Sequence, residues 1–149
     1  MTPEHELKAF DLLLIEDEHD IITLMQEFAK KHSIKMKVAK NTAEFMSSIK
    51  MNSYNVLLCD LNLDYEHEGL TILQIYKLML KNGSIPSGKI FSFTFDSIEK
   101  KTLTEKGFDG IIDKDFDSID RFLKEYKVNC NPGKKIETKK KSLSFVPLS

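Results

Sequence analysis

Carboxylates, one hydroxyl and one amine stand at the ends of four short apolar runs in the sequence. They are Glu16 and Asp17 after the first run, Asp60 after the second, Thr94 in the third and Lys114 after the fourth. Carboxylates that lie close together repel one another unless a cation joins them. Mg²⁺ suits such a group because it prefers oxygen ligands and keeps several waters beside a few carboxylates and a phosphate. The residue types therefore predict a magnesium site, provided that the fold brings them together.

Asp60 is the candidate nucleophile of this group, because a carboxylate can attack a phosphorus atom. The cation and the ammonium of Lys114 would neutralise charge on the transferring oxygens, where most of the catalysis of phosphoryl transfer lies. The hydroxyl of Thr94 would donate a hydrogen bond to a phosphoryl oxygen. Bound phosphate would then pull on the chain at Thr94 and Lys114, which provides a route to switching.

The apolar runs alternate with segments of helical periodicity. We expect strands at 12–15, 36–39, 56–59, 90–94 and 111–113, and helices at 20–32, from 41 onward, 70–80, 97–106 and 116–126. Five strands, each followed by a helix, predict an α/β fold with a parallel sheet, right-handed crossovers and helices on both faces. Ligands bind outside the carboxyl ends of the strands in such sheets, which is where the reactive residues are expected.

Local signals mark several helix ends. Asn41 is expected to be an N-cap, with Glu44 three residues later in a capping-box arrangement. Gly107 is expected to end the helix that begins near Ser97, as a left-handed residue. The last helix carries its apolar residues on one side, which we expect to face the core: Phe116, Ile119, Phe122, Leu123 and Tyr126.

Length and composition indicate one globular domain, since 149 residues with 41% hydrophobic and 30% charged side chains are ordinary for this class. The apolar runs are too short to cross a bilayer. The N-terminus lacks the basic start and apolar stretch of a signal peptide. We therefore expect a cytoplasmic protein without a membrane partner.

Charge divides the chain into an acidic body and a basic end. Residues 127–149 carry six Lys and one Glu, whereas residues 1–126 carry 16 basic and 22 acidic residues. An acidic body argues against direct nucleic-acid binding. The expected organisation is an N-terminal extension at 1–9, a domain at 10–127 and a basic C-terminal tail or linker at 128–149.

The segments around the reactive residues resemble response-regulator receiver domains, and the chemotaxis-type single-domain receivers in particular. The resemblance covers about residues 10–126 and is carried by LLLIEDE at 12–18, YNVLLCDLNL at 54–63, GL at 69–70, FT at 93–94 and GFDGIIDK at 107–114. It implies a flavodoxin-like, doubly wound, five-stranded parallel sheet.

The resemblance also implies roles for individual residues. Glu16 and Asp17 would bind Mg²⁺ together with Asp60, the phosphoacceptor, and Asn62 would add its backbone carbonyl. The protein would be a phosphoacceptor that promotes its own phosphorylation and dephosphorylation rather than an enzyme. Its partners would be a histidine kinase or histidine phosphotransfer protein and a downstream protein target, and a homodimer is compatible with this function.

Departures from the family pattern keep a second interpretation open. Phe95 stands where the family prefers a small residue, Ile111 where it often has an aromatic one, and Asp115 where it has proline. The loop after Asp60 also looks one residue longer. The chain would then be a degenerate receiver, a protein-interaction module that works without phosphorylation.

A phosphatase of the haloacid-dehalogenase kind is the third interpretation, because these enzymes also use an aspartate nucleophile and Mg²⁺. They usually carry a second Asp two residues after the first, where this chain has Asn62. Their nucleophile normally follows the first strand, whereas Asp60 follows the third expected strand.

Overall fold

A computed structural model describes residues 7–94, 103 and 106–129 of the chain. The strands are β1 (Lys8–Ile15), β2 (Met36–Ala39), β3 (Asn52–Cys59), β4 (Lys89–Thr94) and β5 (Gly110–Asp113). The helices are α1 (His19–Lys31), α2 (Thr42–Met51), α3 (Glu68–Lys81) and α5 (Phe116–Asn129). The helix expected at 97–106 lies outside the described residues, apart from Leu103 and Lys106. In the part that is described, no helix is long and apolar enough to cross a membrane.

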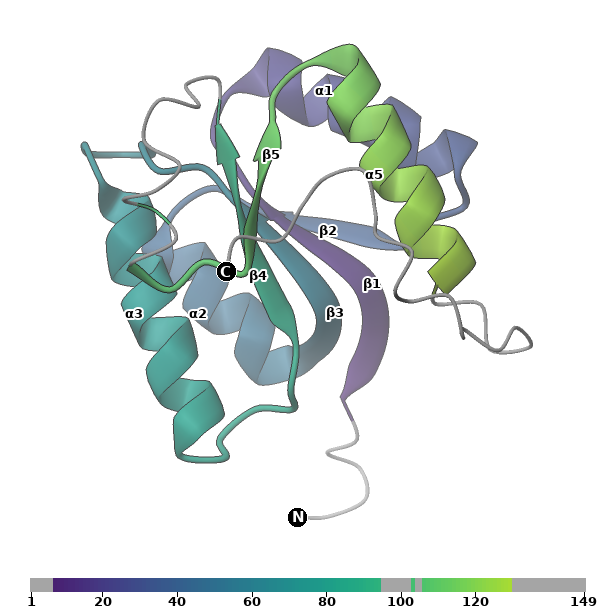
Figure 1. Ribbon diagram of the computed structural model, residues 1–149. Helices are drawn as coiled ribbons and strands as arrows, with labels where there is room; N and C mark the ends of the chain where they lie inside the picture. The colour runs from purple at the N-terminus through teal and green to yellow at the C-terminus, as the bar shows by residue number, and fades with distance from the viewer. Residues whose placement is uncertain (1–6, 95–102, 104–105, 130–149) are drawn as a thin grey trace.

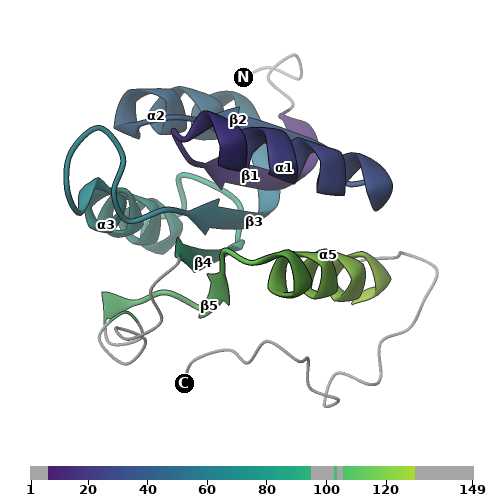
Figure 2. The same ribbon diagram turned by 90° about the horizontal axis from the view of Figure 1, so that it is seen from above.

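The five strands form one sheet in the order β2-β1-β3-β4-β5, and every pairing is parallel. Figure 1 shows α1 and α5 over one face of the sheet and α2 and α3 over the other, and Figure 2 shows the same three layers from above. The doubly wound α/β fold expected from the sequence is therefore confirmed. Its parallel order brings the carboxyl ends of all five strands to one edge.

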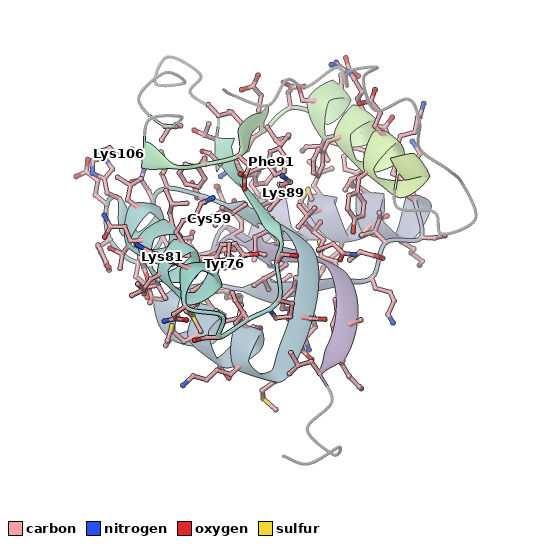
Figure 3. All side chains as sticks on the ribbon, turned by 60° about the horizontal axis from the view of Figure 1, so that its bottom comes forward. Cys59, Tyr76, Lys81, Lys89, Phe91 and Lys106 are labelled. Carbon is pink, nitrogen blue, oxygen red and sulfur yellow. The ribbon has the colours of Figure 1, made fainter. Side chains whose placement is uncertain are left out.

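Both faces of the central strands are buried, which explains why their sequences are continuous apolar runs rather than alternating ones. One cluster of side chains packs between the sheet and helices α1 and α5, and a second packs between the sheet and helices α2 and α3. Phe91 belongs to the first cluster and Tyr76 to the second, and both are labelled in Figure 3. The two clusters hold the strand ends from both sides.

Several strands and helices are longer than the sequence pattern predicted. Strands β1 and β3 both begin four residues earlier than expected, because their first residues pair with one another from Lys8 and Asn52 onward. Helix α3 begins at Glu68 rather than residue 70, and α5 continues to Asn129. The added strand residues mix polar and apolar side chains, such as Lys8 and Phe10, so no continuous apolar run marked them in the sequence.

Phe116 was expected to face the core, but it is 61% exposed. Its ring instead meets that of Phe28 of α1 edge to face, with the ring centres 4.7 Å apart. The other four residues expected on this side of α5 are buried: Ile119, Phe122, Leu123 and Tyr126. The first turn of α5 projects beyond the core, so helical periodicity alone overestimated its burial.

The caps of α2 and α5 are built from side chains close in sequence. Asn41 accepts a hydrogen bond from the backbone N–H of Glu44 at 2.9 Å, as expected. The Glu44 carboxylate accepts from the N–H of Lys40 at 2.8 Å, one residue before the N-cap. Asp115 caps α5 by accepting from the N–H of Ser118 at 2.8 Å. Asp115, where the family has proline, thus supplies a helix cap.

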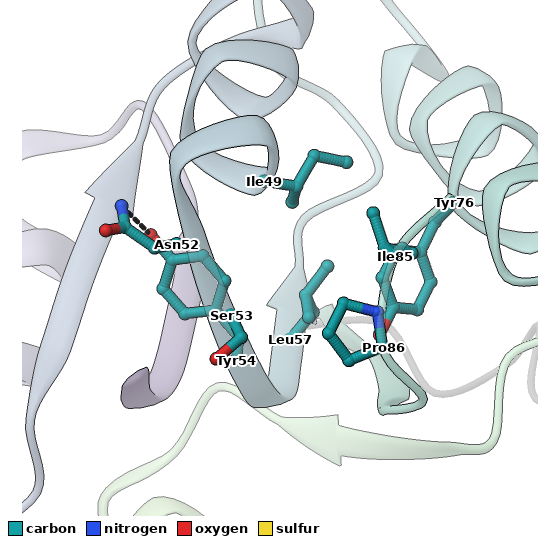
Figure 4. A pocket seen from close by; sticks show the side chains of 8 residues that line it. All are labelled: Ile49, Asn52, Ser53, Tyr54, Leu57, Tyr76, Ile85 and Pro86. Carbon is teal, nitrogen blue, oxygen red and sulfur yellow. Dashed lines mark hydrogen bonds between the residues drawn. The ribbon is translucent and has the colours of Figure 1, made fainter. Parts of the chain in front are cut away.

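A small cavity lies at the opposite edge of the sheet from Asp60, among the first residues of β3 (Figure 4). Its volume is about 10 Å³, which is about the space of one water. It is lined by Ile49, Asn52, Ser53, Tyr54, Leu57, Tyr76, Ile85 and Pro86. A cavity of this size and position has no part in the chemistry at the other edge.

Gly69, the second residue of α3, touches the backbone of Asp60 and Leu61. A Cβ at Gly69 would overlap the carbonyl oxygen of Asp60 and lie 2.7 Å from the Cα of Leu61. The N–H of Gly69 also donates to the carbonyl of Leu61 at 2.8 Å. Helix α3 can approach Asp60 this closely only because residue 69 has no side chain.

We predict that Gly69→Ala destabilises the fold by about 1–2 kcal/mol. Helix propensity alone would favour alanine by about 1 kcal/mol. Overpacking costs about 1–3 kcal/mol, and the obstructing atoms are backbone that cannot rotate away. Urea unfolding followed by circular dichroism measures the difference. Gly83→Asn is the control, since Gly83 has a φ of 76° and open space around it and asparagine tolerates that conformation. Equal stability of wild type and Gly69→Ala would contradict the close contact.

Candidate functional site

Backbone hydrogen bonds continue past the strand ends and align the reactive residues. The N–H of Asp60 donates to the carbonyl of Ile15 at 3.0 Å, and that of Glu16 donates to Ala39 at 3.0 Å. On the other side of β3, the N–H of Lys114 donates to the carbonyl of Thr94 at 2.9 Å. Glu16, Asp60 and Lys114 thus each continue the backbone pairing of a strand by one residue, so the sheet sets their positions.

Lys114 joins the buried carboxylate of Glu16 to the partly exposed carboxylate of Asp60. Its Nζ lies 2.8 Å from Oε1 of Glu16 and 3.2 Å from Oδ2 of Asp60. The Lys114 side chain is 3% exposed, that of Glu16 0% and that of Asp60 14%. The ammonium also lies over the Phe93 ring at 5.3 Å, where the negative face of the ring attracts a cation. This lysine supplies the opposite charge that two close carboxylates require.

The pKa of Glu16 is set mainly by the removal of water from around its carboxylate. The pKa of Glu16 is raised overall from its usual 4.5 to about 7, mainly by burial and to a smaller extent by the negative charge of Asp60. The hydrogen bond and charge of Lys114 lower this pKa, as does the N–H of Glu18, 3.2 Å from Oε2. Because the net shift is upward, Glu16 accommodates a proton near neutral pH in the absence of a further cation.

A divalent cation fits the oxygen atoms of this cluster. Glu16, Asp17 and Asp60 each offer one carboxylate oxygen, and these atoms lie within 4.8 Å of one another. In a Mg²⁺ octahedron adjacent ligands are about 3 Å apart and opposite ones about 4.2 Å, so the three oxygens would have to draw closer together to bind one ion. Asp17 is exposed and Asp60 partly exposed, which leaves room for the waters that Mg²⁺ retains. These three residues are the candidate ligands.

Asn62 begins the loop between β3 and α3 and lies next to Asp60. Its N–H is 3.3 Å from Oδ1 of Asp60. Its side-chain oxygen accepts from the N–H of His67 at 2.8 Å, which closes the loop on itself. His67 has a left-handed φ of 66°. The expected role of the Asn62 backbone carbonyl toward the cation stays a prediction.

Thr94 and Ile111 lie on the α2–α3 side of the sheet. Thr94 is 8% exposed at the end of β4 and pairs in register with Asp113. Ile111 is 7% exposed and packs in the cluster beneath α3. Phe95, which departs from the family pattern, lies outside the described residues. Glu16, Asp60 and Lys114 are thus in direct contact, Asp17 lies beside the two carboxylates, and Thr94 ends the neighbouring strand.

Cys59 does not compete with Asp60 as a nucleophile. Its side chain, which is labelled in Figure 3, is fully buried. Its Sγ lies 3.3 Å from the carbonyl oxygen of Asp60. Burial, followed by the charges of Asp60 and Glu16, raises the pKa of this thiol well above its usual 9.0. Because the thiolate is the reactive form, Cys59 is chemically inert.

Glu68 was missed by the sequence reasoning, which placed it in the loop. It is 2% exposed, and its carboxylate accepts hydrogen bonds from Thr42 and Asp64. The partners are 26 and 4 residues away in sequence. The small Gly69 was the only nearby signal, since nothing local indicates that α2 and α3 meet at this point.

We predict that Mg²⁺ affinity rises with pH up to about pH 7 and levels off above it. A proton on Glu16 competes with the cation, because carboxylate ligands must be deprotonated. The raised pKa places this competition below about pH 7, with up to about a tenfold change in affinity per pH unit. Isothermal titration calorimetry from pH 5.5 to 8 measures it, and Glu16→Gln should bind more weakly with a flatter profile. Parallel profiles for the two proteins would contradict the role of Glu16.

Comparison with protein families gives one match over most of the chain. The family model described as the response regulator receiver domain matches residues 12–126. No curated protein is similar enough to the sequence to be matched.

Solved structures of receiver domains share the fold. A matching chain comes from the co-crystal structure of the Saccharomyces cerevisiae histidine phosphotransfer signaling protein Ypd1 and the receiver domain of its downstream response regulator Ssk1. Its TM-score is 0.68 at 20% identity, with 89% of this chain and 96% of that chain covered. The Francisella response regulator 1452 receiver domain has a TM-score of 0.65 at 23% identity, covering 84% and 99%.

The chemotaxis response regulator CheY4 of Vibrio cholerae has a TM-score of 0.64 at 14% identity and covers 81% of this chain and 99% of that chain. The strand order, the carboxylates with their lysine and the family match over 12–126 agree with one another. The chain belongs to the response regulator receiver domain family.

Proposed function

We propose that Asp60 accepts a phosphoryl group in a phosphorelay, with Mg²⁺ held by Glu16, Asp17 and Asp60. The observation that carries this proposal is the Lys114 ammonium between Glu16 and Asp60, at the edge of the sheet where Asp17 completes a set of cation ligands. Asp60 is the member of this set that both contacts Lys114 and keeps part of its side chain in solvent. It is therefore the carboxylate that an incoming phosphorus atom can reach.

The roles of the residues follow from their contacts. An Asp60 oxygen attacks phosphorus, and the bond from phosphorus to the donor nitrogen or oxygen breaks as the new bond forms. Lys114 stabilises the added negative charge on the phosphoryl oxygens, and Thr94 donates its hydroxyl to one of them. Mg²⁺, when bound, neutralises phosphoryl oxygens and keeps the carboxylates together. Asn62 adds its backbone carbonyl to the cation site.

The donor in this proposal is a histidine kinase or a histidine phosphotransfer protein, which suits a cytoplasmic location. The co-crystal structure of a receiver domain with a phosphotransfer protein among the similar structures supports this choice. The downstream step is a conformational change read by a target protein. A phosphorylation-independent module is not favoured, because the acidic residues and the lysine are assembled. Family membership also does not support the phosphatase alternative.

An apolar hollow beside the site offers a contact surface for the donor. It has a volume of about 210 Å³ and lies between α1 and the start of α5. Phe116 lines it only two residues after Lys114, so a protein bound there is close to the reacting carboxylate. The other lining residues are Leu24, Glu27, Phe28 and Lys31. An exposed aromatic ring beside a leucine, with charged residues at the edge, is typical of a protein contact.

We predict that acetyl phosphate with Mg²⁺ phosphorylates the wild-type chain and that Asp60→Ala abolishes the adduct. Intact-mass spectrometry detects the phosphoryl group, and omission of Mg²⁺ should reduce its yield. Asp64→Ala is the matched control, because Asp64 is an exposed carboxylate of the same loop that is outside the proposed cation site. An unmodified wild type, or an undiminished adduct on Asp60→Ala, would refute the proposal.

We predict that Phe116→Ala slows phosphoryl transfer from a protein donor by about tenfold or more, since interface aromatics often contribute more than 1 kcal/mol. Its rate with acetyl phosphate should stay within about twofold of wild type, because the small donor does not need the hollow. Quenched-flow assays with both donors give the two rates. Leu78→Ala is the control at an exposed position on α3. Equal decreases in the two rates would mean that Phe116 contributes to folding and not to docking of the donor.

A further inference from the structure

Glu68, the first residue of α3, holds a buried carboxylate that the proposed chemistry does not use. Its Oε2 accepts hydrogen bonds from the N–H of Thr42 at 2.7 Å and from the Thr42 hydroxyl at 2.6 Å. Its Oε1 accepts from the N–H of Asp64 at 2.8 Å. One side chain therefore joins the start of α2, the start of α3 and the middle of the loop between β3 and α3.

Among the described residues, hydrogen bonds rather than a cation stabilise the charge on this carboxylate. Burial raises the pKa of Glu68, but the hydrogen bonds from Thr42, Asp64 and Tyr65 outweigh it, so that the pKa is lowered overall. Thr42 and Glu68 begin helices α2 and α3, whose N-terminal ends carry partial positive charge. The carboxylate thus stays ionised and accepting, which a loop anchor requires.

The loop that Glu68 holds is the segment that follows Asp60. At its start, the N–H of Asn62 contacts Asp60, and at its end the N–H of Gly69 donates to Leu61. Between these points the exposed residues 64–67 have little apolar burial to keep them in place. Hydrogen bonds from the backbone of Asp64, at 2.8 Å, and of Tyr65 to the Glu68 carboxylate connect this stretch to a buried group.

We infer that Glu68 is a positioning residue for phosphoryl transfer at Asp60, acting by holding the loop 61–67 against the start of α2. The inference rests on the proposed function and adds a requirement to it: the loop must be fixed for Asn62 and Asp60 to present their oxygens in the reactive arrangement. Small misplacements of reacting groups cost large factors in rate. The longer loop noted in the sequence needs this anchor because it has more chain to order.

Glu68→Gln tests the inference with the least change of shape. The NH₂ group of the glutamine amide must then face the N–H of Thr42 or of Asp64. Because two donors cannot form a hydrogen bond with each other, one of the two hydrogen bonds is lost. We expect the maximal rate of phosphorylation by acetyl phosphate at saturating Mg²⁺ to fall about tenfold. Glu68→Asp keeps the charge but is one methylene shorter, and it should restore part of the rate.

Asp109→Asn separates positioning from general stability. Asp109 also accepts from a backbone N–H, that of Ile90 at 2.8 Å, but at the opposite edge of the sheet. The Asp109→Asn variant should unfold at a lower urea concentration, whereas the folded variant should be phosphorylated at the wild-type rate. Rates are measured at a temperature where circular dichroism shows every variant folded.

The outcomes are distinguishable. If wild type is not phosphorylated on Asp60, the proposed function fails, whatever Glu68 does. If wild type is phosphorylated and folded Glu68→Gln reacts at the wild-type rate, the positioning role is overturned, as it is if Asp109→Asn slows the reaction equally. Should Glu68→Gln not fold, Thr42→Val removes only the hydroxyl donor and should slow the reaction about threefold. An unchanged rate for that variant overturns the role.

Discussion

The repulsion between carboxylates at one edge of the sheet is the constraint on which this structure depends. Parallel strands end side by side, so the residues that follow them meet whatever their charge. Glu16 and Asp60 follow neighbouring strands, and Lys114 supplies an ammonium within 3.2 Å of both. Because a buried charge without a partner is costly, the lysine stabilises the fold in the same position from which it can serve phosphoryl transfer.

Two buried carboxylates of this protein are stabilised in different ways. Glu16 has an ammonium close by, but burial still raises its pKa to about 7. Glu68 is surrounded by neutral donors and two helix N-termini in the described part of the chain, yet its pKa is lowered. The difference follows from geometry: several short hydrogen bonds replace the lost water around Glu68. The first group remains responsive to a cation, whereas the second is a permanent part of the framework.

The loop after Asp60 joins these two environments. It starts at Asp60, the proposed phosphoacceptor, and ends at Gly69, where α3 touches the backbone of Asp60. A cation or phosphoryl group bound at Asp60, as proposed, would act on a segment that is fastened to α2 and α3 through the buried Glu68. Such a segment would transmit displacement to the helices, which suits a protein that signals by conformational change.

The sequence by itself determined the parallel sheet and the acidic residues with their lysine, because strands buried on both faces appear as apolar runs and reactive residues follow their ends. The five strands and four of the expected helices were predictable on this basis. Only the tertiary structure decided the exposure of Phe116 and the burial of Glu68. Both depend on where separate helices meet: Phe116 at α1, and Glu68 at Thr42 of α2, 26 residues away. Periodicity describes one element at a time, whereas these contacts form only when the helices pack on the sheet.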